Sequence, residues 1–186
     1  MTKMWANLST AYPGVTLRVM QGHDMEFSYR VYASSRAEEM ARLVDWSEAR
    51  KGEFLRFQFT AQHTHYQTHY PAARYDVIVR DGEDIGRLYV ARLHGEIRLM
   101  DIALLSEHRN QGIGHALVKE LLDEAADDGK PVTLHVEERN PAKRLYERLG
   151  FDEVGEETFY KRMCWAPPGR ELPRVADSRR RETGLR

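Results

Sequence analysis

Several short stretches of the chain alternate apolar and polar residues, which is the pattern of a β-strand with one face buried. These stretches occupy residues 15–20, 75–80, 85–93 and 97–105. Asp81-Gly82 stands between the second and third stretch, and His94-Gly95 between the third and fourth. Such dipeptides are typical of tight turns. The pattern therefore predicts a first strand and then two consecutive hairpins.

Other segments have the apolar spacing and the end signals of helices. We expect helices at residues 24–34, 37–44, 47–66, 111–128 and 141–149. Asp24 is a suitable N-cap for the first, Pro71 follows the third, and Gly129 ends the fourth. Pro141 opens the fifth, where the missing N–H of proline costs nothing.

Further strands are predicted at residues 131–137, 151–154 and 158–163. Strand 97–105, helix 111–128 and strand 131–137 follow one another directly, which is the order of a crossover between parallel strands. The sequence therefore predicts an α+β fold. Its sheet is mixed and mostly antiparallel, with one parallel strand–helix–strand crossover, and helices flank it.

The composition is that of an ordinary globular protein. The 186 residues suffice for one domain, and 28 basic against 29 acidic residues give a net charge of −1. No global field therefore attracts nucleic acid or a membrane surface. No stretch reaches the roughly 18 apolar residues of a membrane span, and the N-terminus lacks the apolar run of a secretory signal.

Composition also divides the chain into three parts. We expect an N-terminal extension over residues 1–14, a domain over residues 15–165 and a basic tail over residues 166–186. The tail contains the run Arg179 to Arg181 and almost no large apolar residue, so we expect it to be disordered and solvated.

Cysteine usage bears on the compartment and on the chemistry. The single cysteine, Cys164, has no partner for an internal disulfide, which favours a reducing, cytoplasmic location. We interpret Cys164 as an inert thiol at the end of a strand and not as a nucleophile.

Residues 109–114, RNQGIG, carry the strongest chemical signal. They lie between a predicted strand and a helix whose buried face is marked by Ile113, Leu117, Leu121 and Ala125. The free N–H groups and the positive dipole end of such a helix bind anions, and glycine lets a phosphate approach the backbone. A Rossmann fingerprint would need glycine in place of Leu117, and a P-loop would need Gly-Lys after the loop.

The same residues resemble a known family. RNQGIG fits R/Q-x-x-G-x-G/A, the pyrophosphate loop of the GNAT superfamily of N-acetyltransferases. Residues 140–151, NPAKRLYERLGF, resemble the family's second motif, N-x-x-A-x-x-x-Y-x-x-x-G-F. Tyr146 stands six residues after Asn140, where family members often have seven. Ala142 and Tyr146 keep their spacing, so the departure falls on Asn140. The resemblance is strong over about residues 97–151.

The resemblance implies acetyl-CoA as the donor, a small-molecule or peptide amine as the acceptor, and no metal. Dimers are common in the family, so a homodimer is compatible with it. In the family two neighbouring strands splay apart to receive the pantetheine arm, and a strand N–H stabilises the oxyanion. The residues of this chain that match the family's CoA contacts are Ile102, Ala103, Leu104, Arg109, Asn110, Gln111, Gly112, Ile113, Gly114, Asn140 and Tyr146.

Catalysis needs a proton donor and a base. Tyr146 matches the family's general acid, which protonates the departing thiolate. The acceptor amine is mostly ammonium at neutral pH, so a base or a water chain must remove a proton. Two strand carboxylates are candidates: Glu137, at the end of its strand and on the same face as His135, and Asp101, beside the expected oxyanion position.

Two alternatives belong to other classes of protein. His65 and His69 have the i, i+4 spacing of metalloprotease zinc ligands, but Tyr66 stands where the catalytic glutamate would be, and no third ligand is evident. The His and Tyr residues there are also suited to holding substrate. The other alternative is a binding module that holds acyl-CoA as a sensor or scaffold without turnover.

Overall fold

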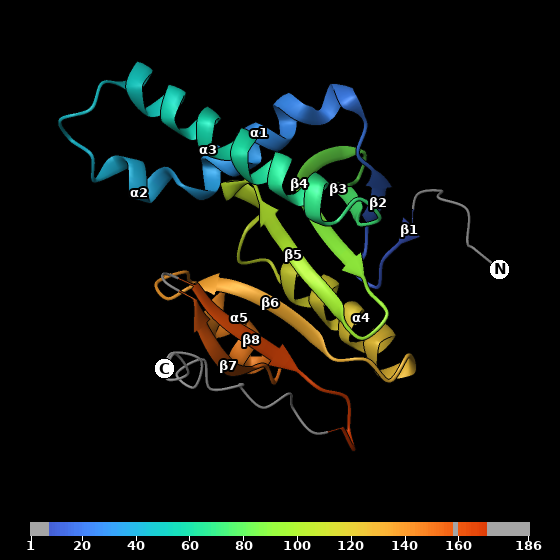
Figure 1. Ribbon diagram of the computed structural model, residues 1–186. Coiled ribbons are helices and arrows are strands. Elements are labelled where there is room, and N and C mark those ends of the chain that lie inside the picture. The colour runs from blue at the N-terminus through green and yellow to red at the C-terminus, as the bar shows by residue number, and fades with distance from the viewer. Residues whose placement is uncertain (1–7, 158–159, 171–186) are drawn as a thin grey trace, which may run out of the picture.

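The computed structural model describes residues 8–157 and 160–170 and contains one mixed sheet (Figure 1). Its strands are β1 (Leu8–Ser9), β2 (Val15–Val19), β3 (Arg74–Arg80), β4 (Glu83–Arg92), β5 (Ile97–Leu104), β6 (Val132–Glu137), β7 (Asp152–Glu157) and β8 (Tyr160–Trp165). Their order across the sheet is β1-β2-β3-β4-β5-β6-β8-β7. Within the described residues only β5 and β6 pair in parallel. The predicted α+β class, with its single parallel crossover, is confirmed.

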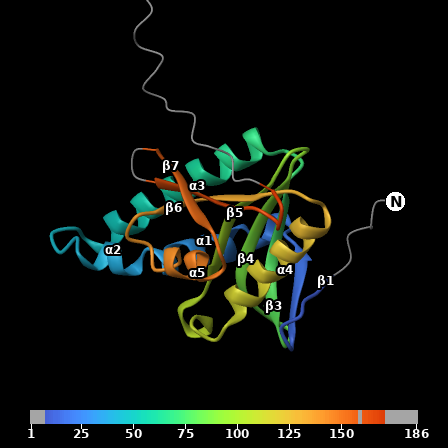
Figure 2. The ribbon, with the colours of Figure 1, turned by 90° about the horizontal axis from the view of Figure 1, so that it is seen from below.

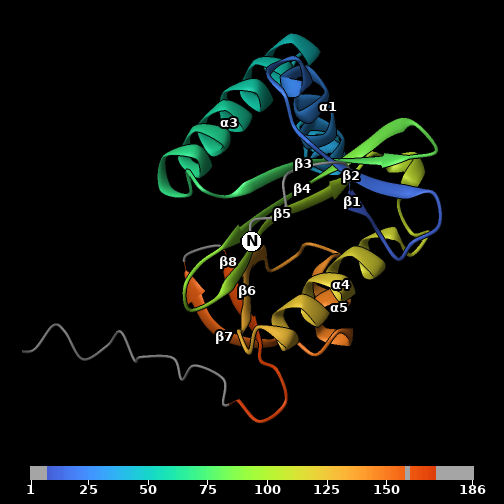
Figure 3. The same cartoon turned by 90° about the vertical axis from the view of Figure 1, so that its right-hand side faces the viewer.

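Helices cover both faces of the sheet. They are η1 (Gly22–Asp24), α1 (Met25–Ser35), α2 (Ala37–Ala41), α3 (Glu48–His69), η2 (Ser106–His108), α4 (Ile113–Asp127) and α5 (Lys143–Arg148). Helices α1 and α3 lie on one face, and α4 and α5 on the other (Figure 3). In Figure 2 the last two helices lie in front of the strands. We call these sides of the sheet the α1/α3 face and the α4/α5 face.

The largest hydrophobic cluster lies between the sheet and α4. Ile113, Leu117, Leu121 and Ala125, the predicted buried face of this helix, are all at most 5% exposed there. Helix α4 begins two residues after the predicted start, because Asn110 and Gly112 have positive φ angles of 59° and 85°, outside the helical region. Helix α3 extends three residues past the predicted end and stops ahead of Pro71.

A β-bulge determines which residues of β5 point to each face. Tyr89 of β4 pairs with Asp101, and the next residue, Val90, pairs with Leu99, so Met100 is an extra residue. An extra residue reverses the alternation of side chains beyond it. Ile97 and Leu99 before the bulge belong to the α4 cluster, and Ile102 and Leu104 after it also pack against that cluster. Asp101 and Ala103 therefore face α1 and α3.

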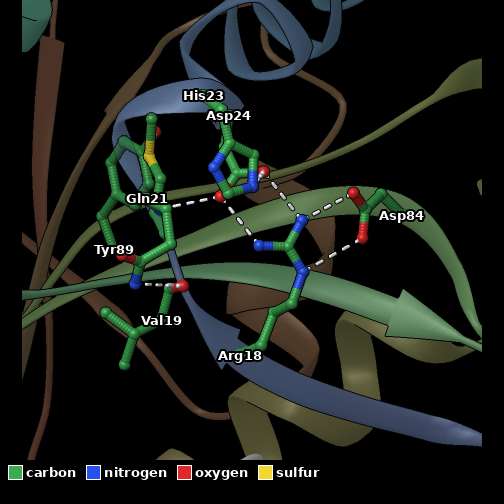
Figure 4. Close-up of polar contacts among 8 residues, drawn as sticks. Arg18, Val19, Gln21, His23, Asp24, Asp84 and Tyr89 are labelled. Atoms are coloured by element: carbon green, nitrogen blue, oxygen red, sulfur yellow. Dashed lines mark hydrogen bonds and ion pairs between the residues drawn. The ribbon is translucent and has the colours of Figure 1, made fainter.

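Asp24 precedes α1, as predicted, but its carboxylate makes no capping hydrogen bond to that helix. It instead accepts two hydrogen bonds from Arg18, at 2.7 and 2.8 Å, and one from the backbone N–H of Gln21. The Arg18 guanidinium also binds Asp84 on β4 (Figure 4). A buried carboxylate gains more from a bidentate arginine than from one backbone amide, so this ion pair outcompetes capping.

The two ends of the chain extend past the described residues. Leu8 and Ser9 of the expected extension pair with β2. Arg170, in the expected tail, hydrogen-bonds the carbonyl of Gly129. The run Arg179 to Arg181 lies outside the described residues, so the disorder of the tail remains a prediction. None of the helices in residues 8–157 and 160–170 has the length and apolar character needed to cross a membrane.

Candidate active site

Strands β5 and β6 pair over three residues and then diverge. Ile97, Arg98 and Leu99 align with the first three residues of β6, and no pairing follows. Beyond that point β5 stays paired with β4 as far as Leu104, and β6 stays paired with β8 as far as Glu137. The edges of β5 and β6 that face each other therefore keep backbone groups outside the ladder. The resemblance placed such a splay at Ile102 to Leu104, and these residues lie within it.

The glycine loop leads from β5 into α4. Gly112 is the N-cap of α4 and has φ +85°, a backbone conformation that residues other than glycine rarely adopt. Ala116 donates the first helical hydrogen bond, to the Gly112 carbonyl, so the N–H groups of Ile113, Gly114 and His115 precede the helical ladder. These three groups and the helix dipole make an anion site. A Cβ on Gly114 would make only an ordinary contact, 3.8 Å from Leu145, so the fold itself does not require glycine there.

Side chains of the loop hold it in place. Arg109 donates from Nε to the Leu104 carbonyl at 2.8 Å and from Nη2 to Ser34 Oγ on α1 at 2.9 Å. Gln111 donates to the Glu107 carbonyl at 2.8 Å and accepts from Arg80 at 2.5 Å. The side chains of Arg109 and Gln111 are thus engaged within the protein.

Tyr146 is buried in α5 at 6% exposure, on the α4/α5 face. Its ring packs edge-on against Phe151, with centroids 5.7 Å apart. Within the described residues its hydroxyl makes no hydrogen bond. Burial raises the pKa of the Tyr146 phenol above its usual range, and the nearby negative charge of Asp101 adds to this shift. Tyr146 thus lies on the α4/α5 face, whereas Asp101 lies on the α1/α3 face.

Asp101 belongs to a buried polar cluster on the α1/α3 face. Its carboxylate accepts a 2.5 Å hydrogen bond from Arg87 on β4, whose side chain is 3% exposed. Arg87 also donates to Ser28 of α1 and to Gln62 of α3. The Tyr66 hydroxyl donates to the Met100 carbonyl at the bulge, at 3.0 Å. Sequence reasoning missed Arg87, although an arginine within the apolar strand sequence IGRLYVARL was an available signal.

Glu137 ends β6 and forms an ion pair with Arg36, with 2.6 Å between Oε1 and Nη1. Its side chain is 35% exposed, so it remains in contact with solvent. Asn140 uses its side-chain oxygen to accept the N–H of Ala142 at 2.9 Å, a local turn that leads into α5. A cavity of about 400 Å³ lies there, lined by Asn140, Lys143 and Arg144 among others.

A second cavity, of about 510 Å³, lies on the α1/α3 face beside the splay. Gln62, His65 and Tyr66 of α3 line one wall, and residues of β5, β6 and β8 complete it. Two further lining residues, His135 and Arg162, are cross-strand partners. We call this space the α3 cavity.

The His65 and His69 rings stack with centroids 4.1 Å apart. In the described part of the chain no three His, Cys, Asp or Glu residues are grouped as metal ligands.

The sheet that splays beside a glycine-started helix, with a buried tyrosine on the next helix, is the arrangement that the family resemblance implied. The profile of the acetyltransferase (GNAT) family matches residues 38–151, more than half of the chain. The chain therefore belongs to this family.

One curated relative is the [ribosomal protein bS18]-alanine N-acetyltransferase of Haemophilus influenzae. It is 31% identical over 78 residues, which cover 41% of this chain and 53% of that protein. The chain thus matches about half the length of this relative.

Two solved structures share the fold. The PaiA N-acetyltransferase of Thermoplasma acidophilum, in complex with coenzyme A, has a TM-score of 0.62 and 18% identity, over 82% of this chain and 98% of that one. The spermidine N-acetyltransferase of Vibrio cholerae, in complex with CoA and spermine, has a TM-score of 0.57 and 23% identity, over 83% and 96%. Both structures contain coenzyme A on the same fold.

Proposed function

We propose that this protein transfers the acetyl group of acetyl-CoA to a primary amine by direct attack in a ternary complex. The observation that carries the proposal is the splay between β5 and β6. The glycine loop and Tyr146 lie on its α4/α5 side, and the α3 cavity lies on the other. Donor and acceptor would thus enter from opposite faces of the sheet and meet where the strands separate.

The donor side fits acetyl-CoA on three points. The N–H groups at the start of α4 suit the pyrophosphate, and the unpaired edge of β5 at Ile102, Ala103 and Leu104 suits the amides of the pantetheine arm. The cavity at Asn140 and Lys143 offers polar and positive groups, and it is also lined by Glu147 and by Glu138, the ion-pair partner of Lys143. Bound acetyl-CoA supplies an activated acyl thioester. The backbone N–H groups of β5 stabilise negative charge on the thioester oxygen.

Tyr146 holds the proton that the leaving thiol needs. Because burial and the charge of Asp101 raise the pKa of its phenol, the hydroxyl stays protonated at neutral pH. Its hydroxyl makes no hydrogen bond within the described residues that would have to break first. The hydroxyl is therefore available as a proton donor, while its raised pKa makes it a weaker acid than a free phenol and fits a modest contribution to the rate.

Of the two candidate bases, we propose that Glu137 removes the proton from the ammonium form of the acceptor, through water. Glu137 ends a strand at the splay, and both it and its ion-pair partner Arg36 are partly open to solvent, so water can compensate the arginine when Glu137 is protonated. Asp101 is the counter-ion of the buried Arg87, and protonating it would leave that guanidinium uncompensated. We therefore assign Asp101 to positioning and charge balance.

Cys164 is unsuited to a covalent acetyl intermediate. It is fully buried in β8, and burial raises the pKa of its thiol to about 11, so little thiolate forms at neutral pH. This property supports direct transfer over a two-step route through the cysteine.

The Tyr146→Phe variant tests the proposal. Removing only the hydroxyl should lower kcat about a hundredfold, at the low end for a general acid, because a thiolate with a parent pKa of about 8.5 already leaves readily. Affinity for acetyl-CoA should change little, since one hydroxyl contributes about 1 kcal/mol. Steady-state kinetics over a panel of amines and calorimetric titration give the two values. Tyr29→Phe on α1 is the matched control.

The outcomes separate the roles. An unchanged kcat would show that water supplies the proton. Acetyl-CoA binding without turnover of any amine would favour the alternative of a non-catalytic acyl-CoA module. For the base, Glu137→Gln should lower kcat/KM most at low pH, where the acceptor is fully ammonium. An equal loss at all pH values would give Glu137 a role in binding instead.

The known acceptors of the relatives, a ribosomal protein alanine and spermidine, set the range of the amine panel. We propose small-molecule and peptide amines as acceptors and residues 15–165 as the catalytic domain. Size-exclusion chromatography with light scattering will test for a homodimer.

A further inference from the structure

The α3 cavity has a chemical character that bears on the acceptor. Its volume of about 510 Å³ is within the usual range for a small-molecule site. Its charged and titratable lining residues are two arginines, two histidines and tyrosines, and no carboxylate of the described residues contributes to it. A polycationic acceptor would therefore find no counter-ion among these lining side chains, whereas an anion would find several donors.

The two arginines differ in what they already bind. Arg98 is paired with Glu96 at 2.8 Å, and its Nη1 donates to the Tyr70 hydroxyl at 2.7 Å. Arg162 has no ion pair with any residue of the described chain. Its Nε is shielded from solvent and has no hydrogen-bond partner. A buried donor left without a partner costs free energy, which a ligand oxygen would recover.

The register of β6 and β8 determines how far Arg162 lies from the proposed base, Glu137. Arg162 lies opposite His135, and Glu137 lies opposite Tyr160, so all four side chains are on one face of the sheet. Diagonal neighbours such as Arg162 and Glu137 are about 7–8 Å apart between Cα atoms. One acceptor molecule can therefore reach Arg162 with one end while its amine lies near Glu137.

We propose that the acceptor carries a carboxylate or a phosphate beside its amine and that Arg162 binds this anion. The planar guanidinium matches both groups with paired hydrogen bonds. The inference rests on the proposed function, because it names the acceptor class of the same site.

Matched acceptors test the proposal on the full chain. β-Alanine and O-phosphoethanolamine carry the two anions, β-alaninamide is the neutral match, and spermidine is the polycation. In wild type at least one anionic amine should have a kcat/KM about tenfold or more above that of β-alaninamide. Arg162→Met should reduce this ratio to about one, and Arg162→Lys should retain part of it. The control Arg42→Met, at an exposed arginine beyond the end of α2, should keep the ratio.

Several results would overturn the inference. If spermidine or β-alaninamide is acetylated as well as the anionic amines, or if Arg162→Met keeps the ratio, the anion site is wrong while the proposed function stands. If no amine is acetylated, calorimetric titration of the CoA-bound protein with β-alanine and O-phosphoethanolamine separates the two ideas. Arg162-dependent binding would support the anion site without transfer, and no binding would reject it.

Discussion

The two faces of the sheet around the splay are built in different ways. On the α4/α5 face the backbone groups proposed to bind the donor come from one continuous segment, in which the end of β5, the glycine loop and the start of α4 lie between Ile102 and Gly114. On the α1/α3 face the polar cluster joins Ser28 of α1, Gln62 of α3, Arg87 of β4 and Asp101 of β5. These residues are distant in sequence and meet only in the folded chain.

This difference follows from what each side recognises. A pyrophosphate and a chain of amides are bound by backbone N–H and C=O groups, which need only a local conformation and the absence of side chains. An acceptor is distinguished by side chains held at a distance by packing and ion pairs. Variants on the α1/α3 face should therefore affect stability first, and variants in the loop should affect ligand binding first.

The largest effect is expected at Arg87. Arg87→Met leaves the partly buried Asp101 without its counter-ion and removes a cation within 5.6 Å of the ring centroids of Phe59 and Tyr89. Breaking such a pair should lower the free energy of unfolding by about 3–5 kcal/mol, measured by urea unfolding. Adding Asp101→Asn should recover part of that loss. A loss below about 1 kcal/mol would show that the cluster does not hold this face together.

In the loop, Gly112→Asp should abolish detectable CoA binding or weaken it at least about a hundredfold, equal to about 2.7 kcal/mol. The left-handed φ of +85° strains a side chain, and the new carboxylate repels the pyrophosphate. Calorimetry on the folded variant gives the affinity. Wild-type affinity would remove the loop from the site.

Gly114→Ala is a more specific test of the loop than Gly112→Asp. The position is helical and has room for a Cβ, so stability should rise by about 0.5–1 kcal/mol while CoA affinity falls. If both rose together, the glycine would have no role in binding phosphate.

Gly86 of β4 tests stability and CoA binding in one variant. A Cβ there would overlap the Ala103 carbonyl oxygen and lie 2.7 Å from the Leu104 side chain, and would push on β5 from its β4 side, opposite the edge proposed to bind pantetheine. Gly86→Ala should therefore cost about 2 kcal/mol of unfolding free energy and also weaken CoA binding. The control is Gly52→Ala in α3, where nothing lies within 4 Å, and it should be neutral or stabilising. Unchanged CoA affinity in Gly86→Ala would separate that edge from the site.

The smallest effect concerns His63, which is buried in α3 and has an unpaired Nδ1. Burial, and then the positive charge of Arg87, lower the pKa of His63 below that of the unfolded chain. The unfolded state therefore takes up the proton first, so stability is full above about pH 6.5 and falls as the pH drops below it.

His63→Phe should flatten that dependence by about 1 kcal/mol or less between pH 6.5 and 5.5, as followed by urea unfolding at each pH. The exposed His94→Gln in the β4–β5 turn gives the background. Parallel curves for wild type and His63→Phe would contradict the prediction.

The amino-acid sequence by itself determined what depends on neighbouring residues. The strand alternation, the Asp81-Gly82 turn and the apolar stripe of α4 predicted the elements and the parallel crossover. Each of these signals is contained in a short run of consecutive residues. The loop at residues 109–114 was also readable, since glycine marks a backbone conformation. Element ends were less readable: the left-handed residues Asn110 and Gly112 moved the start of α4.

Only the tertiary structure decided which side chains meet. The bulge at Met100 turns Asp101 toward Arg87. It shifts the core-facing apolar residues from odd to even positions, but Met100, Ala103 and Leu105 are also apolar and obscure that shift in the sequence. The ion pair of Arg36 with Glu137 joins segments that are a hundred residues apart. The unpaired state of Arg162 is likewise a property of its surroundings. Such contacts depend on the free energy of the whole fold, since burying a charge is tolerated only where distant elements supply its partners.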